Sequence, residues 1–575
     1  MVMDFNFVIG GEAGQGVQSI SYILTKTLAR GGLHVFASQD YESRIRGGHN
    51  FTRIRVSEKP VMAAAEKADL LIALNEETID IHRDELSERG LILFDGGKIT
   101  GVDLTRPPSF SVPFETFAEE KGGSKLLSNT VALGAALGIV GYDLKILGAS
   151  LTKFFSKKGG DIAKRNIDVA KAGYDYVKSN FKGDLSFGLK PTAGSRRLLV
   201  SGNEAIALAA LMVGCKFMSS YPMTPSTGIM QYLAGKSKQF NLVVEQAEDE
   251  ISAINMALGA SFAGVRSLVA TSGGGFSLMV EALGLAGMTE TPIVIVEGQR
   301  PGPATGFPTR TEQGDLEFVL HAAQGEFPRT ILAPSSVEEA FYLTVKAFNL
   351  ADKYQVPVII LSDEHLADSY CTTENFDLSK VTVERGELLS DEDAVRAVDY
   401  KRHKLTSSGV SPRALPGQQN VLVVTDSDEH TEEGHITESA EVRIDMVKKR
   451  LRKLEGLAKE IKNPRIYGPG KGKTLLVGWG STRGAIEEVA DRLRVEGFDV
   501  NLLHLTEIWP FPREAVSKAI DAAEKSLVVE NNATGQMAHL IRAETGKEAT
   551  GKILRFDGRP MTPDYLVQKF KELSG

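Results

Sequence analysis

Two hydroxyl groups stand on a rigid turn in the segment Ser219-Ser-Tyr-Pro-Met-Thr-Pro-Ser-Thr-Gly-Ile-Met230. The segment follows a strand-like run, Cys215–Met218, and precedes a helical pattern. Pro222 and Pro225 restrict the backbone on either side of Thr224, so this threonine and the serine after Pro225 would be fixed donors. They would lie at the carboxyl end of a strand, where open α/β sheets bind ligands. A capped turn between a strand and a helix explains the same residues equally well.

An acidic group, Glu248-Asp249-Glu250, precedes a helical stretch of small residues. The helix dipole favours acids in a first turn, so some of these carboxylates need no function. The small residues are Ala253, Ala257, Gly259, Ala260, Ala263 and Gly264. They predict a helix that packs closely against the core. A carboxylate at its start would face an apolar pocket, where burial raises the pKa.

Two further turns follow strand-like runs. The first, Ala270-Thr-Ser-Gly-Gly-Gly-Phe276, would let a ring or a phosphate lie against bare backbone at Ser272 and Gly273. The second is a proline-rich loop that carries Arg300 and Arg310, and arginines on a rigid loop fit recognition of a carboxylate. The alternatives are a plain strand–helix connection for the first turn and a surface loop with solvated arginines for the second.

A glycine-rich turn lies near the N-terminus, at Gly10-Gly-Glu-Ala-Gly-Gln-Gly16. Glycines between a strand and a helix allow close approach of an anion to the helix N-terminus. The spacing is not that of a G-x-G-x-x-G fingerprint, and Glu12 would repel a pyrophosphate. A tight turn is therefore the alternative to a dinucleotide site.

A second N-terminal motif contains two arginines, Arg44 and Arg46, followed by Gly47 and Gly48. Arginines two residues apart share one face of an extended segment. Two guanidinium groups beside a glycine pair suit a phosphate or a carboxylate. A solvated loop, or a patch of salt bridges between subunits, is an equally good interpretation.

Alternating strand-like and helical runs predict an α/β fold made of three modules, with a parallel sheet in the first. The expected strands lie at 5–9, 70–74, 91–94, 198–200, 242–244, 267–270, 292–296, 356–361, 474–478, 500–503 and 527–530. The expected divisions are residues 1–182, a linker at 183–196 rich in Gly, Ser and Pro, 197–371, a polar connector at 372–462, and 463–575.

The composition narrows the class of protein. A length of 575 residues predicts three or four domains, and a formal net charge of −8 argues against a general nucleic-acid binder. We find no signal peptide and no apolar run of membrane-spanning length, so we expect a cytoplasmic protein without a membrane partner. The two cysteines, Cys215 and Cys371, are too few for a typical iron–sulfur cluster and exclude a disulfide scaffold.

Taken together and in this order, the motifs resemble the alpha subunit of 2-oxoacid:ferredoxin oxidoreductases, with the 2-oxoglutarate type as the best match. The motifs that carry the likeness are Tyr-Pro-Met-Thr-Pro-Ser-Thr, Glu-Asp-Glu-Ile, Thr-Ser-Gly-Gly-Gly and Gly-Gln-Arg-Pro-Gly-Pro-Ala-Thr-Gly. The N-terminal Gly-Gly-Glu-Ala-Gly-Gln-Gly and Ser-Arg-Ile-Arg-Gly-Gly resemble the family's gamma domain, fused ahead of the alpha domains.

The resemblance implies that 1–182 is the gamma-like domain, 197–371 a domain that faces the pyrimidine of thiamine diphosphate, and 463–575 a transketolase C-terminal-like domain. It implies that Glu250 hydrogen-bonds the aminopyrimidine ring, with Glu248 as the rival. It places Thr224 beside the reacting carbon. The further cofactor contacts that it implies are Tyr221, Pro222, Ser272 and Gly273. Arg300 and Arg310 would bind substrate carboxylates, and Arg44, Arg46, Gly47 and Gly48 would contact coenzyme A.

Two absences agree with the resemblance. Thiamine enzymes typically hold Mg²⁺ and diphosphate with a Gly-Asp-Gly, which this sequence lacks, and transfer to ferredoxin needs a cluster. We therefore expect a beta subunit that brings the Mg²⁺–diphosphate module and a [4Fe-4S] cluster, in an αβ or (αβ)2 assembly. The expected reaction converts a 2-oxoacid, coenzyme A and oxidised ferredoxin into acyl-CoA, CO2 and reduced ferredoxin.

Other functions stay open at this stage. Pyruvate or a branched-chain 2-oxoacid could replace 2-oxoglutarate as the substrate. A non-catalytic scaffold subunit is an alternative from another class. A stand-alone nucleotide-binding oxidoreductase that uses the first glycine turn is a third, and Glu12 counts against it.

Overall fold

The computed structural model describes residues 3–44, 47–102, 107–183, 188–192, 197–469 and 472–574. The chain forms two compact units. The first unit comprises Met1–Val200, Ser369–Asn375 and Thr562–Tyr565, and the second comprises Ser201–Asp368, Phe376–Met561 and Leu566–Gly575. No helix among the described residues is both long enough and apolar enough to cross a membrane.

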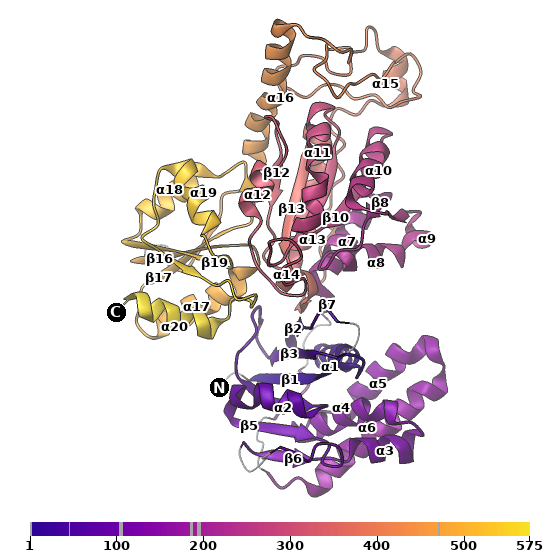
Figure 1. Ribbon diagram of the computed structural model, residues 1–575, viewed down its shortest axis with the longest axis vertical. Helices are drawn as coiled ribbons and strands as arrows, with labels where there is room; N and C mark the ends of the chain where they lie inside the picture. Colours follow the sequence, from indigo (N-terminus) through magenta and orange to yellow (C-terminus); the bar gives the residue numbers. More distant parts are fainter. Residues whose placement is uncertain are drawn as a thin grey trace. The chain divides into compact units, whose positions relative to one another are not determined.

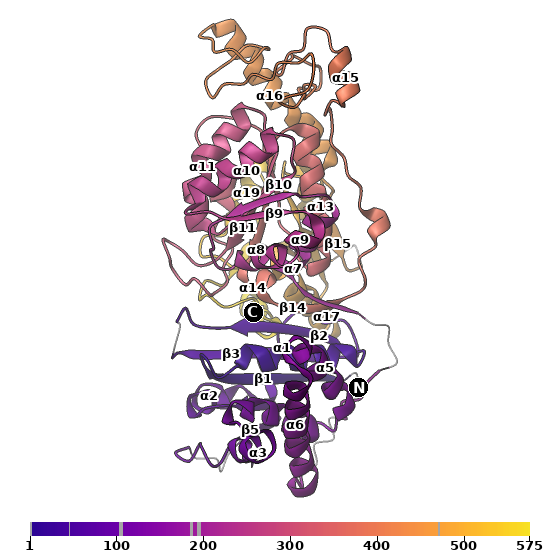
Figure 2. The ribbon, with the colours of Figure 1, turned by 90° about the vertical axis from the view of Figure 1, so that its right-hand side faces the viewer.

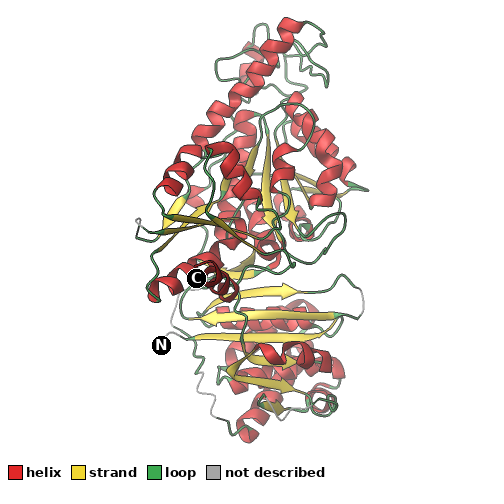
Figure 3. Cartoon of the chain, turned by 60° about the vertical axis from the view of Figure 1, so that its left-hand side comes forward, coloured by secondary structure: helices red, strands yellow, loops and turns green. Residues whose placement is uncertain are grey.

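The first unit is built on an eight-stranded sheet in the order β6-β5-β4-β1-β3-β2-β14-β7. Its strands are β1 (Asp4–Glu12), β2 (His34–Asp40), β3 (His49–Ser57), β4 (Ala68–Ala73), β5 (Leu86–Phe94), β6 (Ser109–Ser111), β7 (Leu198–Ser201) and β14 (Tyr370–Thr373). Its helices are α1 (Val17–Arg30), α2 (Glu76–His82), α3 (Phe114–Gly122), α4 (Ser128–Ile139), α5 (Leu144–Phe155) and α6 (Gly160–Asn180). Figure 3 shows the long strands of this sheet side by side.

This sheet is mixed, which corrects the expected parallel layer. β1 is parallel to β4 but antiparallel to β3, and β3 is antiparallel to β2. Antiparallel neighbours need no crossover helix, so the short loop after Asp40 suffices to join β2 to β3. The sequence pattern gave no sign of either strand, because both carry polar residues along a partly exposed face.

Strand alternation divides the apolar residues of the first unit between two cores. Phe5, Phe7 and Ile9 pack in the larger core with residues of α1 and α4, whereas Val8 faces the smaller core with Ile79 of α2. A period of two places successive side chains on opposite faces, so both faces must be covered. Figure 2 shows α1, α5 and α6 together in front of the strands.

The second unit contains a seven-stranded sheet in the order β18-β12-β13-β11-β10-β8-β9 and a five-stranded sheet in the order β15-β17-β16-β19-β20. The strands are β8 (Phe217–Ser220), β9 (Val243–Gln246), β10 (Ser267–Thr271), β11 (Ile293–Gln299), β12 (Thr330–Leu332), β13 (Pro357–Asp363), β15 (Arg465–Tyr467), β16 (Thr474–Trp479), β17 (Val500–Leu505), β18 (Glu507–Trp509), β19 (Lys525–Glu530) and β20 (Gly551–Leu554). The longer helices are α7 (Gly202–Met212), α8 (Thr227–Ala234), α10 (Glu250–Phe262), α11 (Gly273–Met288), α13 (Val337–Tyr354), α16 (Ala440–Glu460), α17 (Arg483–Val495), α18 (Arg513–Asp521), α19 (Gln536–Thr545) and α20 (Pro563–Ser574). The shorter ones are α9 (Ser237–Phe240), α12 (Leu316–His321), α14 (Glu364–Asp368) and α15 (Asp391–Arg396).

One strand of the last module leaves its own sheet. β18 pairs antiparallel with β12, at the edge of the seven-stranded sheet. A single apolar cluster accordingly contains residues of both sheets, such as Val269 and Ile295 with Val477 and Trp479. The two α/β modules of the second unit thus share a core.

The polar connector is anchored by buried charges. Figure 1 shows it as mainly irregular chain between α15 and α16. Lys449 and Lys453 of α16 are 0% and 1% exposed and both form ion pairs with Glu290, which follows α11. The His403 ring nitrogen Nδ1 lies 3.0 Å from the same carboxylate. Arg402 Nη2 donates to the Glu290 carbonyl oxygen at 2.7 Å. A buried carboxylate with these partners ties the connector to the seven-stranded sheet.

Candidate active site

The carboxyl ends of β8, β10 and β11 meet at one edge, because β10 lies between the other two strands. The turn after β8 is held from both sides. Ser226 Oγ donates a hydrogen bond to the Thr271 carbonyl oxygen at the end of β10. Arg300 Nη1 donates to the Thr224 carbonyl oxygen at 2.8 Å, from the loop after β11. The structure therefore brings Thr224 and Arg300 together.

The three cofactor-site candidates of this turn differ in exposure. Tyr221 is 40% exposed, while Pro222 and Thr224 are half-buried. The turn precedes α8 directly, so both sequence interpretations, a ligand-facing hydroxyl and a strand–helix turn, fit its local structure.

Glu250 is the first residue of α10 and is 3% exposed. The helix is capped by Asp249, whose side chain accepts a hydrogen bond from the Ser252 amide at 2.7 Å. Glu250 is thus not needed as the cap, and its Oε1 has no hydrogen-bond partner among the described residues. Burial raises the pKa of this carboxyl. Its rival Glu248 is exposed.

The glycine turn after β10 lies against this carboxylate. Ser272 precedes α11 as its N-cap residue, and its buried Oγ has no partner among the described residues. A Cβ at Gly275 would overlap Thr271 Oγ1 and Glu250 Oε1, and one at Gly273 would lie 2.5 Å from the Asp315 carboxyl oxygen. A side chain at either position would therefore displace one of these two acids.

Sequence reasoning missed a set of acids at the same edge. Glu297 and Asp363, at the ends of β11 and β13, are 0% and 2% exposed. Burial raises the pKa of Glu297 well above its usual range, and the Asp315 and Asp363 carboxyls raise it further, against the opposing effect of Arg300. Burial also raises the pKa of Asp315. Glu297 and Asp315 therefore both hold a proton more tightly than free carboxyl groups do. The sequence does carry a signal for Glu297 and Asp363, because each is an acid at the carboxyl end of an otherwise apolar strand.

Arg300 and Arg310 are in different surroundings. Burial lowers the pKa of the Arg300 guanidinium, and the nearby carboxyls of Glu297 and Asp315 partly offset this effect by raising the pKa. Arg310 instead packs against Gly558, whose added Cβ would lie 3.2 Å from Arg310 Cβ. Burial, together with the nearby charge of Arg559, lowers the pKa of Arg310 to about 10. Arg310 thus contacts the last module at Gly558, while the charged groups that act on it are Arg559 and Glu364.

The N-terminal candidates belong to the first unit. Arg44 is exposed and pairs with Glu42 at 3.1 Å, in the loop that joins β2 to β3. Gly47 and Gly48 have φ angles of 74° and 79°, which favour glycine. Arg46 lies outside the described residues.

The glycine-rich turn at 10–16 is closely packed. A Cβ at Gly10 would lie 2.6 Å from Thr78 Cγ2, and Gln15 Oε1 accepts a hydrogen bond from the Glu12 amide at 2.7 Å. Close packing accounts for Gly10, and the φ angles of 95° and 77° account for Gly14 and Gly16.

Three family descriptions match the chain in succession. Residues 6–176 match Pyruvate ferredoxin/flavodoxin oxidoreductase, residues 208–449 match Pyruvate flavodoxin/ferredoxin oxidoreductase, thiamine diP-bdg, and residues 472–566 match Pyruvate:ferredoxin oxidoreductase core domain II. A 2-oxoacid:ferredoxin oxidoreductase subunit alpha from a Sulfolobus species is 34% identical, over 98% of this chain and 96% of its own length. This chain belongs to the family of 2-oxoacid:ferredoxin oxidoreductase alpha subunits.

Other members of the family carry more specific names. The 2-oxoglutarate oxidoreductase subunit KorA of Mycobacterium tuberculosis is 28% identical over 93% of this chain and 86% of its own length. The 2-oxoglutarate:ferredoxin oxidoreductase of Magnetococcus marinus, solved with 2-oxoglutarate, coenzyme A and succinyl-CoA bound, is 32% identical and superposes with a TM-score of 0.92, covering 99% of both chains. The predicted α/β fold of three modules and the assignment to an oxidoreductase are confirmed.

Proposed function

We propose that this alpha subunit, with a beta subunit, catalyses the CoA-acylating oxidative decarboxylation of 2-oxoglutarate. The products are succinyl-CoA and CO2, and the two electrons released reduce two ferredoxins. The observation that carries the proposal is the buried Glu250 carboxylate, whose Oε1 has no donor among the described residues and lies beside a glycine turn. Residues 208–449 match a thiamine diphosphate-binding family, and an aminopyrimidine ring offers the hydrogen-bonding edge that such a carboxylate lacks.

Each side chain has a distinct task in this proposal. Thiamine diphosphate, when bound, supplies the carbon nucleophile that attacks the 2-oxo group. Glu250 would hold the aminopyrimidine ring through a hydrogen bond to a ring nitrogen, and because burial raises the pKa of this carboxyl, the carboxyl keeps a stronger hold on the proton in that bond. Tyr221, Pro222, Ser272 and Gly273 line the cofactor. The Thr224 hydroxyl orients the reacting carbonyl.

The arginines set the substrate class. Arg300, fixed by its hydrogen bond to the turn that carries Thr224, binds the carboxylate next to the 2-oxo group. Arg310 would bind the second carboxylate of the substrate. The 2-oxoglutarate bound by the relative from Magnetococcus marinus supports this preference.

The remaining components lie with partners. The beta subunit supplies Mg²⁺, the diphosphate site and a [4Fe-4S] cluster, and the assembly is αβ or (αβ)2. Arg44, Arg46, Gly47 and Gly48 are the proposed contacts for coenzyme A, which the Magnetococcus marinus relative binds. The proposed location of the complex is the cytoplasm.

The test is anaerobic co-expression of this chain with the beta chain, followed by an assay of viologen reduction. We expect reduction that requires both 2-oxoglutarate and coenzyme A. Glu250→Ala should lower the rate by at least about 100-fold while the complex still assembles. The matched variant Glu248→Ala should keep the rate of the unaltered complex. Reduction without coenzyme A, or full activity of Glu250→Ala, would contradict the proposal. Unchanged rates for Thr224→Ala and Arg300→Ala as well would instead indicate a scaffold.

A further inference from the structure

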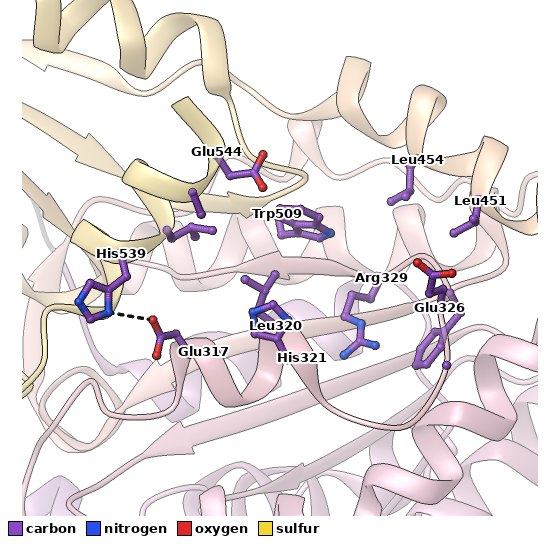
Figure 4. A pocket seen from close by; sticks show the side chains of 14 residues that line it. Glu317, Leu320, His321, Glu326, Arg329, Leu451, Leu454, Trp509, His539 and Glu544 are labelled. Carbon is purple, nitrogen blue, oxygen red and sulfur yellow. Dashed lines mark hydrogen bonds and ion pairs between the residues drawn. The ribbon is translucent and has the colours of Figure 1, made fainter. Parts of the chain in front are cut away.

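A cavity of about 430 Å³ lies within the second unit and contains none of the residues proposed for the active site (Figure 4). It is lined by α12 and the segment that follows it, by α16, by β18 and by α19. Its volume lies within the range of pockets that bind small molecules. Two modules and the polar connector therefore build a ligand-sized space to which the proposed reaction gives no role.

The walls of the cavity are mainly apolar. The apolar lining residues are Leu320, Phe327, Leu451, Leu454, Trp509 and Leu540. In Figure 4 Trp509, Leu451 and Leu454 lie on one side of the space and Leu320 and Arg329 on the other. An aromatic or aliphatic body of a ligand would be buried between these walls.

One cation lines the cavity without a matching anion. Arg329 is 6% exposed, and its Nη1 donates to the Val319 carbonyl oxygen at 3.1 Å. Its guanidinium carbon lies 4.4 Å from the centre of the Phe327 ring. Among the described residues no carboxylate forms an ion pair with it. Burial lowers the pKa of Arg329 to about 10, so the group is charged at neutral pH. A buried guanidinium in this state still has N–H donors to offer a ligand.

The nearby acids are already engaged or solvated. Glu317 Oε1 lies 3.2 Å from His539 Nδ1, and Glu544 pairs with Arg513 at 2.8 Å. Glu326 is exposed at the rim. Arg329 is therefore the charged group that determines which ligand the interior accepts.

We propose that this cavity binds a small carboxylate with an apolar body, whose carboxylate pairs with Arg329 and whose body packs against Trp509 and Phe327. A planar guanidinium recognises a carboxylate through two parallel hydrogen bonds. Since the cavity lies between α16 and α19, a bound ligand would contact both the connector and the last module and stabilise their packing. The site is independent of the thiamine chemistry proposed above.

The test uses an isosteric series on the purified full chain: 4-phenylbutyrate, 4-phenylbutyramide and 4-phenylbutylamine. Trp509 reports binding, because the only other tryptophan, Trp479, is 0% exposed in the core. We expect saturable quenching by the acid, with the amide bound at least about 10-fold more weakly and the amine more weakly still. Equal affinity for all three, tighter binding of the amine, or no saturable quenching would overturn the proposal.

Variants locate the site. Arg329→Gln should reduce the affinity for 4-phenylbutyrate to that for 4-phenylbutyramide. Arg542 is an exposed arginine of α19 outside the cavity, so Arg542→Gln should leave the preference for the acid over the amide unchanged. Should Arg329→Gln fail to fold, Ala543→Trp serves in its place, because this exposed residue can fill the cavity without disturbing the core. It should abolish binding measured by calorimetry. Tight binding of the acid to Ala543→Trp or an unchanged preference in Arg329→Gln would exclude this cavity.

Discussion

At the scale of single residues, burial distinguishes side chains that the sequence treats alike. Glu248 and Glu250 are the same residue type two positions apart, yet one is exposed and the other is buried at the start of α10. The difference arises because Asp249 takes the capping position, so the next residue turns toward the glycine turn after β10. Glu297 shows the same principle, since an acid at the end of a buried strand is held in a low-dielectric environment.

Replacing Glu297 by Gln should change how stability depends on pH. Because the folded-state pKa of Glu297 is raised above the ordinary value of 4.5, the folded chain holds a proton that the unfolded chain releases. Stability is therefore lost as pH rises from about 4.5 through the raised value. Glu297→Gln mimics the protonated acid, so its melting temperature should fall less as the pH rises from about 4.5 than that of the unaltered chain. Calorimetry at each pH measures this, with the exposed Glu281→Gln as the control. If the melting temperatures of Glu297→Gln and of the unaltered chain depended on pH in the same way, the prediction would be wrong.

At the scale of elements, the ends of neighbouring strands fix the site. β8, β10 and β11 are adjacent in the sheet, and each is followed by a turn that contributes one group: Thr224, the glycine turn or Arg300. Helix α11 approaches α10 closely only because Gly275 lacks a side chain. The glycine therefore controls the space around Glu250.

Gly275→Ala should destabilise the chain by about 1–3 kcal/mol, because the new methyl group overlaps Thr271 and Glu250 and overpacks the turn. It should also lower turnover in the viologen assay by displacing the Glu250 carboxyl. Gly284→Ala, in the same helix, is the matched control: its Cβ would meet its nearest neighbour at an ordinary 3.7 Å, and alanine favours a helix by up to about 1 kcal/mol. Denaturant unfolding compares the two, and a Gly275→Ala chain as stable as Gly284→Ala would disprove the role of close packing.

At the scale of the whole molecule, segments far apart in sequence complete shared structures. β18 comes from the last module and extends the seven-stranded sheet, and β14, which follows the second module, pairs with β2 in the first unit. The connector depends on Glu290, which forms ion pairs with both Lys449 and Lys453 in the interior. Removing that carboxylate leaves buried cations without their anion.

Glu290→Gln should lower the free energy of unfolding by about 3–5 kcal/mol, since two buried lysines lose their ion pairs. Limited proteolysis should then cut the connector between α15 and α16 first, because its anchor is lost. The control is Glu392→Gln, whose ion pair with Arg396 is exposed and 3.9 Å long, and it should change stability by less than about 1 kcal/mol. Equal stability of the two variants would show that the buried network does not hold the connector.

The sequence by itself determined the α/β class, the turns at Thr224, Ser272 and Arg300, and the acidic start of α10, because these depend on local periodicity and on proline and glycine within a few residues. It also identified the family, through motifs that occur in order along the chain. Tertiary structure alone decided that Glu250 rather than Glu248 is buried and that Glu297 and Asp363 are buried at the ends of neighbouring strands. It also decided that Arg310 packs against Gly558 and that the first sheet is mixed. These outcomes depend on strand order and on contacts between residues far apart in sequence, whose burial and charge no local pattern records. The two cysteines remain free thiols, one buried and one half-buried.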